Sequence, residues 1–198
     1  MPSDVDRLTA ALRRPSRASS DFDLNPAVAL AEARVLRPAA VLVALWTRGA
    51  QVEIVLTKRA SHLKHHPGQI AFPGGKVEPE DAGPEAAALR EAQEEIGLAP
   101  GNVRLLGMLP PHETVTGFTV TPVLGVIRDD FMPVRDPGEV EEVFTVPLSH
   151  VLSPDNYGIE GRMWRGQVRR YYAVPWGPYY IWGATARILR GLAERVAG

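Results

Sequence analysis

Short stretches rich in β-branched and aliphatic residues recur along this chain and are separated by turn signals. Residues 41–46 and 52–58 are two such stretches, and the Arg48-Gly49 pair between them supplies a turn. This pattern is typical of neighbouring strands joined by a tight connection. Further strands are expected at residues 103–109, 118–127 and 142–146, and a further hairpin at residues 162–173 about Arg165-Gly166.

Apolar residues at helical spacing are clearest between residues 84 and 96. Leu89, Ala92 and Ile96 form one apolar stripe, as in an amphipathic helix that packs on a core. Pro84 suits the first position of a helix, and Gly97 can end one in a left-handed conformation. These signals together predict a helix over residues 84–96.

The ends of the chain also carry helical patterns. Helices are expected at residues 3–14, 26–36 and 183–196. Strands that alternate with helices indicate an α/β fold. We therefore predict a helical N-terminal extension over residues 1–36 and a single α/β domain over residues 37–198, a length sufficient for one hydrophobic core.

The predicted helix at residues 84–96 carries a cluster of acidic residues. At about 100° per residue, Glu91 and Glu95 point in nearly the same direction, and Glu94 lies beside them. Because like charges one turn apart destabilise a helix, a compensating interaction is expected. A solvated acidic surface is the simplest interpretation. The alternative is a site for Mg²⁺ or Mn²⁺, since hard cations prefer carboxylate oxygens.

A pair of glycines precedes this helix. Phe72-Pro73-Gly74-Gly75 ends a predicted extended segment. Paired glycines let the backbone approach a metal or phosphate without interference from a Cβ atom. On its own such a pair indicates only a turn, but its position before the acidic helix favours the metal site.

These residues together resemble the Nudix box, in which a glycine and a loop precede Arg-Glu-x-x-Glu-Glu-x-Gly on a helix. The matching positions are Gly75, Arg90, Glu91, Glu94, Glu95, Gly97 and Leu98. One position departs from the box, because the glutamate expected in the loop falls on Ala82. Asp81 stands beside it, and an insertion of one residue restores an acidic group there. This departure is typical of one Nudix subgroup, the coenzyme A pyrophosphatases.

Three other segments resemble the same subgroup. They are the run Leu56–Gly75 upstream of the box, Leu109-Pro110-Pro111 followed by Val115-Thr116-Gly117, and Ile181-Trp182-Gly183 before the last helix. The resemblance covers roughly residues 40–195. It implies the Nudix fold, a mixed and curved β-sheet sandwiched between helices.

The resemblance also implies an activity. Nudix pyrophosphohydrolases of this subgroup hydrolyse the diphosphate bond of coenzyme A or acyl-CoA to 3′,5′-ADP and (acyl-)4′-phosphopantetheine. The implied cofactor is Mg²⁺ or Mn²⁺, bound mainly by Glu91 and Glu95, with help from Glu94 and the carbonyl of Gly75. Arg90 is expected to orient Glu91 or Glu94 through a charge-assisted hydrogen bond.

A further acidic residue often comes from a loop that follows the sheet in this family. Glu139, Glu141 and Glu142 precede an apolar run at residues 143–148 that resembles the closing strand. Glu139 has the best offset for a metal ligand or a catalytic base. An exposed loop acid is an equally weighted interpretation, and the general base stays unassigned.

Coenzyme A carries a 3′-phosphate and a diphosphate, so cationic side chains should converge on it. The expected substrate-binding residues lie on the loop that enters the box: Arg59, Lys64, His65, His66 and Gln69. Four arginines of the predicted hairpin, Arg162, Arg165, Arg169 and Arg170, alternate with aromatic residues. They either bind adenine and phosphate or form the solvated edge of the hairpin, and we favour the second interpretation.

Composition limits the remaining function classes. The net charge is −1 and there is no cysteine, so disulfides, thiolate catalysis and zinc–sulfur sites are excluded. This charge balance gives no reason to expect nucleic-acid or anionic-membrane binding. The longest apolar run, Ala39 to Trp46, is too short to cross a bilayer. With no leader pattern at the N-terminus, we expect a cytoplasmic enzyme for small molecules.

Two other functions stay open at this point. The first is Nudix hydrolysis of ADP-ribose, a dinucleoside polyphosphate or a (d)NTP. The second is a catalytically silent nucleotide-binding module, although such a module has no need of a repelling cluster of glutamates. The sequence does not define the oligomeric state, for which a homodimer is one candidate.

Overall fold

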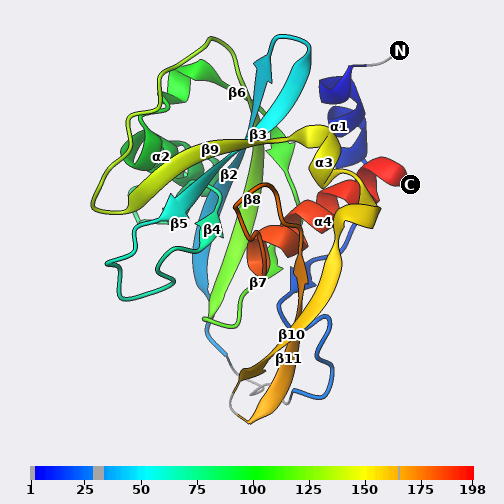
Figure 1. Cartoon of the computed structure of the whole chain (residues 1–198). Helices are drawn as coiled ribbons and strands as arrows, with labels where there is room; N and C mark the ends of the chain where they lie inside the picture. Colours follow the sequence, from blue (N-terminus) through cyan, green and yellow to red (C-terminus); the bar gives the residue numbers. More distant parts are fainter. Residues whose placement is uncertain (1–2, 29–33, 165) are drawn as a thin grey trace.

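The computed structural model describes residues 3–28, 34–164 and 166–198 (Figure 1). Its helices are α1 (Asp4–Leu12), α2 (Pro84–Ile96), α3 (Leu148–Val151) and α4 (Ala184–Ala197), with short 3₁₀ turns at Pro100–Asn102 and Pro154–Asn156. Its strands are β1 (Ser19–Ser20), β2 (Arg37–Arg48), β3 (Gln51–Arg59), β4 (Ile70–Ala71), β5 (Gly74–Lys76), β6 (Val103–Met108), β7 (His112–Glu113), β8 (Phe118–Ile127), β9 (Val140–Pro147), β10 (Gly158–Trp164) and β11 (Gln167–Ala173).

In the described part of the chain, nine strands form one mixed sheet in which β1, β7, β8, β2, β3 and β4 follow one another. β2 runs parallel to β8 and antiparallel to β3. At its start, β2 also pairs with the short β5, which places Gly75 opposite Ala40. β9 pairs with the other side of β3 and β6 pairs with β8, while β10 and β11 form a separate hairpin. This pairing places the glycines of β5 beside the centre of the sheet.

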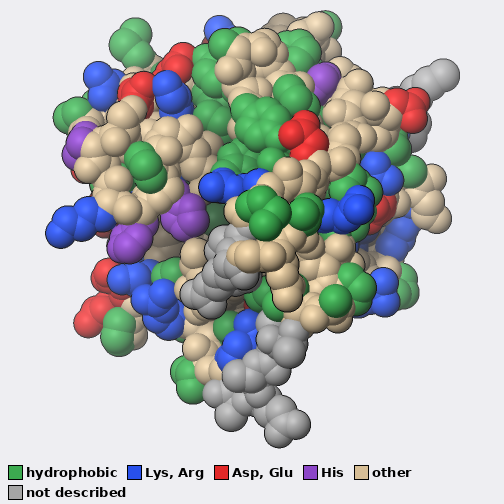
Figure 2. Space-filling view, turned by 60° about the horizontal axis from the view of Figure 1, so that its bottom comes forward, with side chains coloured by type: hydrophobic (Ala, Val, Ile, Leu, Met, Phe, Trp, Pro, Cys, Tyr) green, Lys and Arg blue, Asp and Glu red, His purple; other side chains and the backbone are tan. Residues whose placement is uncertain are grey.

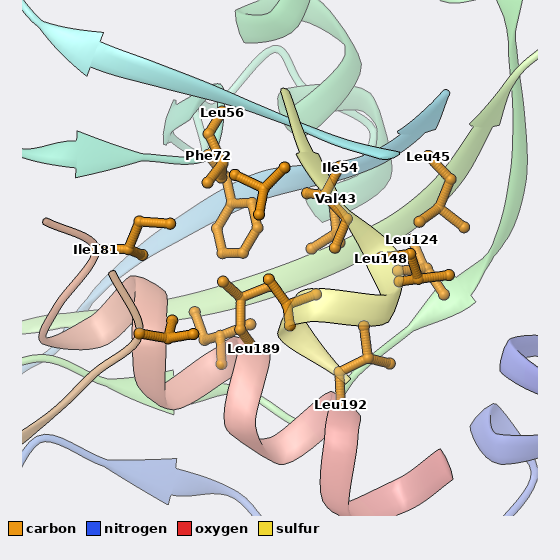
Figure 3. Packing of buried hydrophobic residues seen from close by; sticks show 14 of the residues in the cluster. Val43, Leu45, Ile54, Leu56, Phe72, Leu124, Leu148, Ile181, Leu189 and Leu192 are labelled. Atoms are coloured by element: carbon orange, nitrogen blue, oxygen red, sulfur yellow. The ribbon is translucent and has the colours of Figure 1, made fainter. Parts of the chain in front are cut away.

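The two faces of the sheet are covered by different helices. Ala40, Leu42 and Ala44 of β2 pack with α2 in one buried cluster. Val43 and Leu45, which alternate with them, pack with α4 in a second cluster, where Leu189 and Leu192 point at the sheet (Figure 3). Successive side chains of a strand face opposite sides, so β2 is buried on both faces. The expected fold, a mixed sheet between helices, is confirmed.

Most of the predicted elements are present. The helix over residues 84–96 has the expected bounds, and Gly97 ends it with φ 71°. The N-terminal segment differs, because α1 ends at Leu12 and residues 26–28 form only a turn. Residues 34–36 have no regular structure and residues 29–33 lie outside the described ranges, so the described part of 26–36 does not contain the predicted helix.

The N-terminal segment is built into the domain. Leu8 of α1 is buried in the cluster beneath α4, and β1 pairs in parallel with β7. Residues 1–36 were predicted as a separate extension, and their independent role stays a prediction. Within the described ranges, no helix combines the length and hydropathy needed to cross a membrane.

A buried polar network fixes this segment to the sheet. Asp21 accepts hydrogen bonds from the N–H of Val115 (2.9 Å), contacts His112 Nε2 (3.3 Å) and forms an ion pair with Arg169 (2.9 Å). Burial acts to raise the pKa of Asp21, but the hydrogen bond and charge of His112 and the other partners outweigh it and lower the pKa. Ser19 Oγ contacts the other ring nitrogen of His112 at 2.9 Å. The network joins β1, β7 and the hairpin.

Candidate active site

Glu95 lies at the centre of the acidic face, between α2 and the sheet. Its exposed fraction is only 4%, and its carboxylate accepts a hydrogen bond from the N–H of Gly74 at 3.1 Å. Burial, followed by the charges of Glu91 and Glu139, raises the pKa of Glu95 to about 8, against the lowering effect of Gly74 and Arg59. A buried carboxylate with two acidic neighbours is a strong attractor for a cation.

Glu91 lies one turn earlier on the same helix and presses against the backbone of Gly75. A Cβ atom on Gly75 would lie within 2.6 Å of the Glu91 carboxylate, closer than any real side chain tolerates. Burial raises the pKa of Glu91, with Arg90 acting in the opposite direction and Glu94 and Glu139 adding to the increase. The glycine is therefore required for the position of this carboxylate.

Arg90 holds the outer part of the acidic face. Its guanidinium donates hydrogen bonds to both carboxylate oxygens of Asp81, at 3.1 and 3.0 Å. It also donates to Glu91 at 3.0 Å and to Glu94 at 3.1 Å. The hydrogen bond to Asp81 is the largest of the effects that raise the pKa of Arg90. Asp81 thus occupies the acidic position in the loop that the departure at Ala82 left open.

The carboxylate of Glu94 differs from its neighbours, because 59% of its side chain is exposed. The ion pair with Arg90 holds it at the rim of the acidic face. Glu94 is therefore placed near Glu91 but outside the buried centre.

Glu139 comes from the loop before β9 and approaches the same centre. Its carbonyl accepts a hydrogen bond from the N–H of Ala60 at 2.8 Å, which fixes the loop to the end of β3. Its charge contributes to the raised pKa of both Glu91 and Glu95. Glu139 itself is exposed. The structure therefore brings the loop acid into electrostatic range of the acidic helix, as its offset in the sequence predicts.

The end of β3 and the loop after it supply cations near the acidic centre. The charge of Arg59 lowers the pKa of Glu95, and within the described residues its buried Nε has no hydrogen-bond partner. His66 has φ 55°. Although His66 is exposed overall, partial desolvation and the charge of Arg59 lower the pKa of its imidazole. Lys64 and His65 are both exposed on the same loop. Figure 2 shows histidines gathered with basic side chains on one face of the molecule.

The predicted hairpin arginines have separate environments. Arg169 pairs with Asp21, and the backbone of Arg170 is held by the side chain of Asn25 at 2.7 and 2.9 Å. Arg162 is exposed, and the Cζ atom of its guanidinium lies 5.5 Å from the ring centroid of Trp182. Arg165 lies outside the described residues. The pairing of Arg169 with Asp21 was not foreseen, because no local pattern links positions so far apart in the chain.

The segment before α4 carries several aromatic residues, which are more often core than part of a substrate site. Trp176 and Tyr179 do pack against the core cluster, and Tyr179 stacks on Phe144 with ring centroids 3.6 Å apart. Tyr180 differs, since it is 39% exposed and its hydroxyl donates to Glu160 at 2.6 Å. The hydroxyl explains the difference, because Tyr readily keeps a polar end at the surface.

A divalent cation fits the chemistry of this centre. Glu91 and Glu95 are partly or fully buried carboxylates whose pKa values are raised, so a bound cation would remove an existing electrostatic cost. Among the described residues, no three or more Asp, Glu or His side chains lie close enough together to hold a metal ion as they stand, so binding would require these side chains to move. The backbone of Gly74 and Gly75 lies directly against these carboxylates, and the N–H of Gly74 donates to Glu95.

The raised pKa of Glu95 predicts how the stability of the metal-free protein varies with pH. The folded-state pKa of about 8 exceeds the ordinary value of 4.5, so the folded state retains a proton that the unfolded chain has released. This stabilising contribution is complete below pH 4.5 and is lost as the pH rises through about 8. The loss is expected to be on the order of a few kcal/mol.

Thermal unfolding in EDTA at acidic and alkaline pH measures this effect. Wild type should lose more stability with rising pH than Glu95→Gln, which has no titrating group at this position. Identical pH dependence of the two melting temperatures would contradict the raised pKa.

Comparisons with known proteins identify the family. The family model described as NUDIX domain matches residues 36–164. The chain is 46% identical over 160 residues to the "Uncharacterized Nudix hydrolase NudL" of Enterobacter sp. (strain 638), covering 81% of this chain and 83% of that protein. It is 44% identical over 160 residues to the protein of the same description from Salmonella newport (strain SL254), with the same coverage of 81% and 83%.

Solved structures share the fold. A MutT/nudix family protein from Enterococcus faecalis superposes with a TM-score of 0.53 at 17% identity, covering 100% of this chain and 75% of that chain. The Nudix hydrolase RenU from M. smegmatis gives 0.50 at 24% identity, covering 58% and 73%. The matched region includes both Gly75 and the acidic helix. The chain therefore belongs to the NUDIX domain family and is a Nudix hydrolase.

Proposed function

We propose that this Nudix hydrolase cleaves the diphosphate bond of coenzyme A or acyl-CoA, giving 3′,5′-ADP and (acyl-)4′-phosphopantetheine. The observation that carries the proposal is spatial. The three segments that resemble the coenzyme A pyrophosphatases lie far apart in the chain, but Gln69, Val115 and Gly183, one from each, are connected to one another directly or through Asp21.

Two contacts join the first and last of these segments. Thr185 Oγ1 donates to the carbonyl of Ile70 at 3.0 Å. A Cβ atom on Gly183 would lie 3.8 Å from Nε2 of Gln69, so the amide lies over this glycine. The loop after β3 and the start of α4 therefore form one wall. Gln69 is placed at the junction, where its amide can hydrogen-bond a polar group of the substrate.

Asp21 connects the middle segment to the same wall. It accepts a hydrogen bond from the N–H of Val115, and its charge acts on the imidazole of His66. Val115 of the middle segment is thus connected through Asp21 of the N-terminal segment to the loop after β3, and the start of α4 contacts the same loop. A wall built this way suits a long substrate that extends beyond its diphosphate group.

In the proposed mechanism, Glu91 and Glu95 would hold Mg²⁺ or Mn²⁺, and Glu94 and the Gly75 carbonyl would be further ligands. A bound divalent ion would neutralise negative charge on the phosphates and lower the pKa of the attacking water. Arg90 orients Glu91 and Glu94 through its hydrogen bonds.

Water attacks one phosphorus of the diphosphate, and the bridging P–O bond breaks as the other phosphate leaves. Glu139 is the proposed residue for accepting the proton of the attacking water, because it is exposed and approaches Glu91 and Glu95. Arg59, which lies beside Glu95, is placed to bind a non-bridging phosphate oxygen through its unpartnered Nε. Lys64, His65 and His66 are proposed to contact the outer phosphates from the exposed loop.

The substrate is tested by chromatographic analysis of products from a panel of diphosphates with Mg²⁺ or Mn²⁺. Coenzyme A or an acyl-CoA should give the highest kcat/KM and the two named products. Faster turnover of ADP-ribose, a dinucleoside polyphosphate or a (d)NTP would contradict the substrate proposal and leave the family intact. If the protein hydrolyses none of these diphosphates in the presence of Mg²⁺ or Mn²⁺, this result would favour the silent nucleotide-binding module.

Selectivity for the 3′-phosphate is a separate expectation. Dephospho-CoA lacks only this group. Its kcat/KM should therefore be lower than that of coenzyme A if the cations of the loop bind the 3′-phosphate. Loss of one charge-assisted hydrogen bond corresponds to about tenfold or more. Equal kcat/KM values for coenzyme A and dephospho-CoA would show that Lys64, His65 and His66 do not bind the 3′-phosphate.

A further inference from the structure

A cavity lies away from the acidic centre. Its volume is about 720 Å³, and it is bounded by the chain segment after α1, by the loop between β6 and β7, and by one side of α4. This volume lies within the range of small-molecule sites, which is about 300–1,000 Å³. None of the site residues described above, from Arg59 to Glu139, lines it.

The cavity opens on the face of the sheet opposite α2. Pro122 of β8 lines the cavity, whereas the next residue, Val123, is buried in the cluster beneath α2. The lining residues Ile188 and Gly191 belong to α4, which covers the other face (Figure 1). A ligand in this cavity would therefore be separated from the acidic centre by the thickness of the sheet.

Two arginines form a fixed pair at one end of the cavity. Arg195 donates to the carbonyls of Ala11 (2.8 Å), Leu12 (2.9 Å) and Arg14 (2.8 Å). Arg14 in turn donates to the carbonyl of Arg195 at 2.6 Å. These bonds hold two guanidinium groups close together. Burial, followed by the charge of Arg14, lowers the pKa of Arg195, as expected for a cation beside another cation.

The positive charge at this end has no acidic partner. Within the described residues, Arg14, Arg17 and Arg195 form no ion pair with a carboxylate, and Nε of Arg195 is buried without an acceptor. The acidic residue on the lining, Glu194, is engaged by Arg190 at 2.9 Å. An anion in the cavity would offset the repulsion between the arginines and supply the missing acceptor.

The remaining lining is mainly apolar. Leu109, Pro110, Pro122 and Ile188 provide a hydrophobic surface beside the arginines. Three cations favour a dianionic phosphate over a monoanionic carboxylate, and the apolar surface favours an organic group attached to it. We propose that this cavity is a second ligand site, which binds a small phosphate monoester that carries an apolar or aromatic group.

The experiment titrates the intact ¹⁵N-labelled protein with phenyl phosphate, with inorganic phosphate and with benzoate. EDTA is present throughout, so that no metal in the acidic centre recruits the phosphate. Calorimetry gives the Kd, and the Nε–Hε resonance of Arg195 reports on the cavity itself. Phenyl phosphate should shift this resonance and bind about tenfold more tightly than inorganic phosphate or benzoate.

Single substitutions locate the site. Arg17→Gln should weaken phenyl phosphate binding by about tenfold, and because Arg17 is exposed the fold should survive. Arg13→Gln is the matched control, since Arg13 is also exposed but does not line the cavity. Glu95→Gln should bind as wild type does, which separates this site from the hydrolytic one.

Three results would overturn the proposal. The first is an unmoved Arg195 resonance at millimolar phenyl phosphate. The second is an unchanged Kd in Arg17→Gln. The third is equal binding of inorganic phosphate, benzoate and phenyl phosphate, which would indicate nonspecific attraction of anions. None of these results depends on which diphosphate the enzyme hydrolyses.

Discussion

Glu95→Gln is expected to lower kcat by about three orders of magnitude, which corresponds to about 4 kcal/mol of transition-state stabilisation. Glutamine keeps the size of the side chain and can still accept the hydrogen bond from the N–H of Gly74. It removes the negative charge at the buried centre of the acidic face. The loss of activity would therefore report the loss of a metal ligand and not the loss of the fold.

Glu85→Gln is the matched control for this substitution. Glu85 lies in the first turn of α2 and is exposed, where its charge complements the helix dipole by about 0.3–1 kcal/mol. Its removal should leave kcat nearly unchanged and lower the melting temperature slightly. Measuring kcat and melting temperature for both variants, with and without Mg²⁺, separates the two roles.

Metal removal completes the same experiment. Wild type should lose its activity in excess EDTA and regain it with Mg²⁺ or Mn²⁺. Near-wild-type turnover of Glu95→Gln with unchanged metal dependence would show that the acidic face is a solvated surface. Full activity of wild type in EDTA would exclude the metal mechanism altogether.

Local signals in the sequence were sufficient for the core of the fold and for the placement of the acidic residues on one face of α2. Pro84 and Gly97 gave the bounds of α2, because proline at the start and a left-handed glycine at the end are properties of the positions themselves. The spacing of Glu91 and Glu95 placed both on one face of that helix, and Glu95 proves to be the more buried of the two. Helical periodicity determines the direction in which each side chain leaves the helix, but not how deeply it is buried. The burial depends on where β2 and β5 lie.

Contacts between distant segments could not be predicted in this way. Arg90 was expected to contact Glu91 or Glu94, but no pattern in the sequence indicated its bidentate ion pair with Asp81. No local sequence pattern indicated that Asp21 would be buried in a polar network, because the partners of its side chain lie at least 91 residues away in the chain. Its isolated carboxylate in a polar stretch has the sequence pattern of a surface residue. Only pairing of β1 with β7 brings it into the interior.

The described part of residues 26–36 does not contain the predicted N-terminal helix, for a related reason. Alanine-rich sequence favours a helix locally, but Asn25 uses its side chain to hold the backbone of Arg170, and Arg37 begins β2. The described residues between these two anchors form a turn and irregular structure. Tertiary contacts at both ends therefore override the local preference.

Gly75→Ala is expected to separate activity from stability. The added methyl group would lie within 2.6 Å of the Glu91 carboxylate, so this carboxylate must move. It is the end of a flexible side chain, and its displacement should cost little in the free energy of unfolding. A displacement of about 1 Å in a catalytic centre can lower the rate about a hundredfold. We therefore expect kcat to fall by this order and the affinity for Mg²⁺ to fall with it.

Gly101→Ala provides the control for the glycine itself. A Cβ atom on Gly101 meets nothing within 4 Å, and its φ is not positive, so this substitution should change neither kcat nor the melting temperature. If Gly75→Ala instead unfolds the protein, Gly75 is required for the pairing of β5 with β2 and its effect on Glu91 is secondary. If Gly75→Ala keeps wild-type kcat and Mg²⁺ affinity, the position of the Glu91 carboxylate is not critical. A large loss of kcat with an unchanged melting temperature would indicate that Gly75 acts through Glu91, because an unchanged melting temperature would mean that the pairing of β5 with β2 is preserved in the variant.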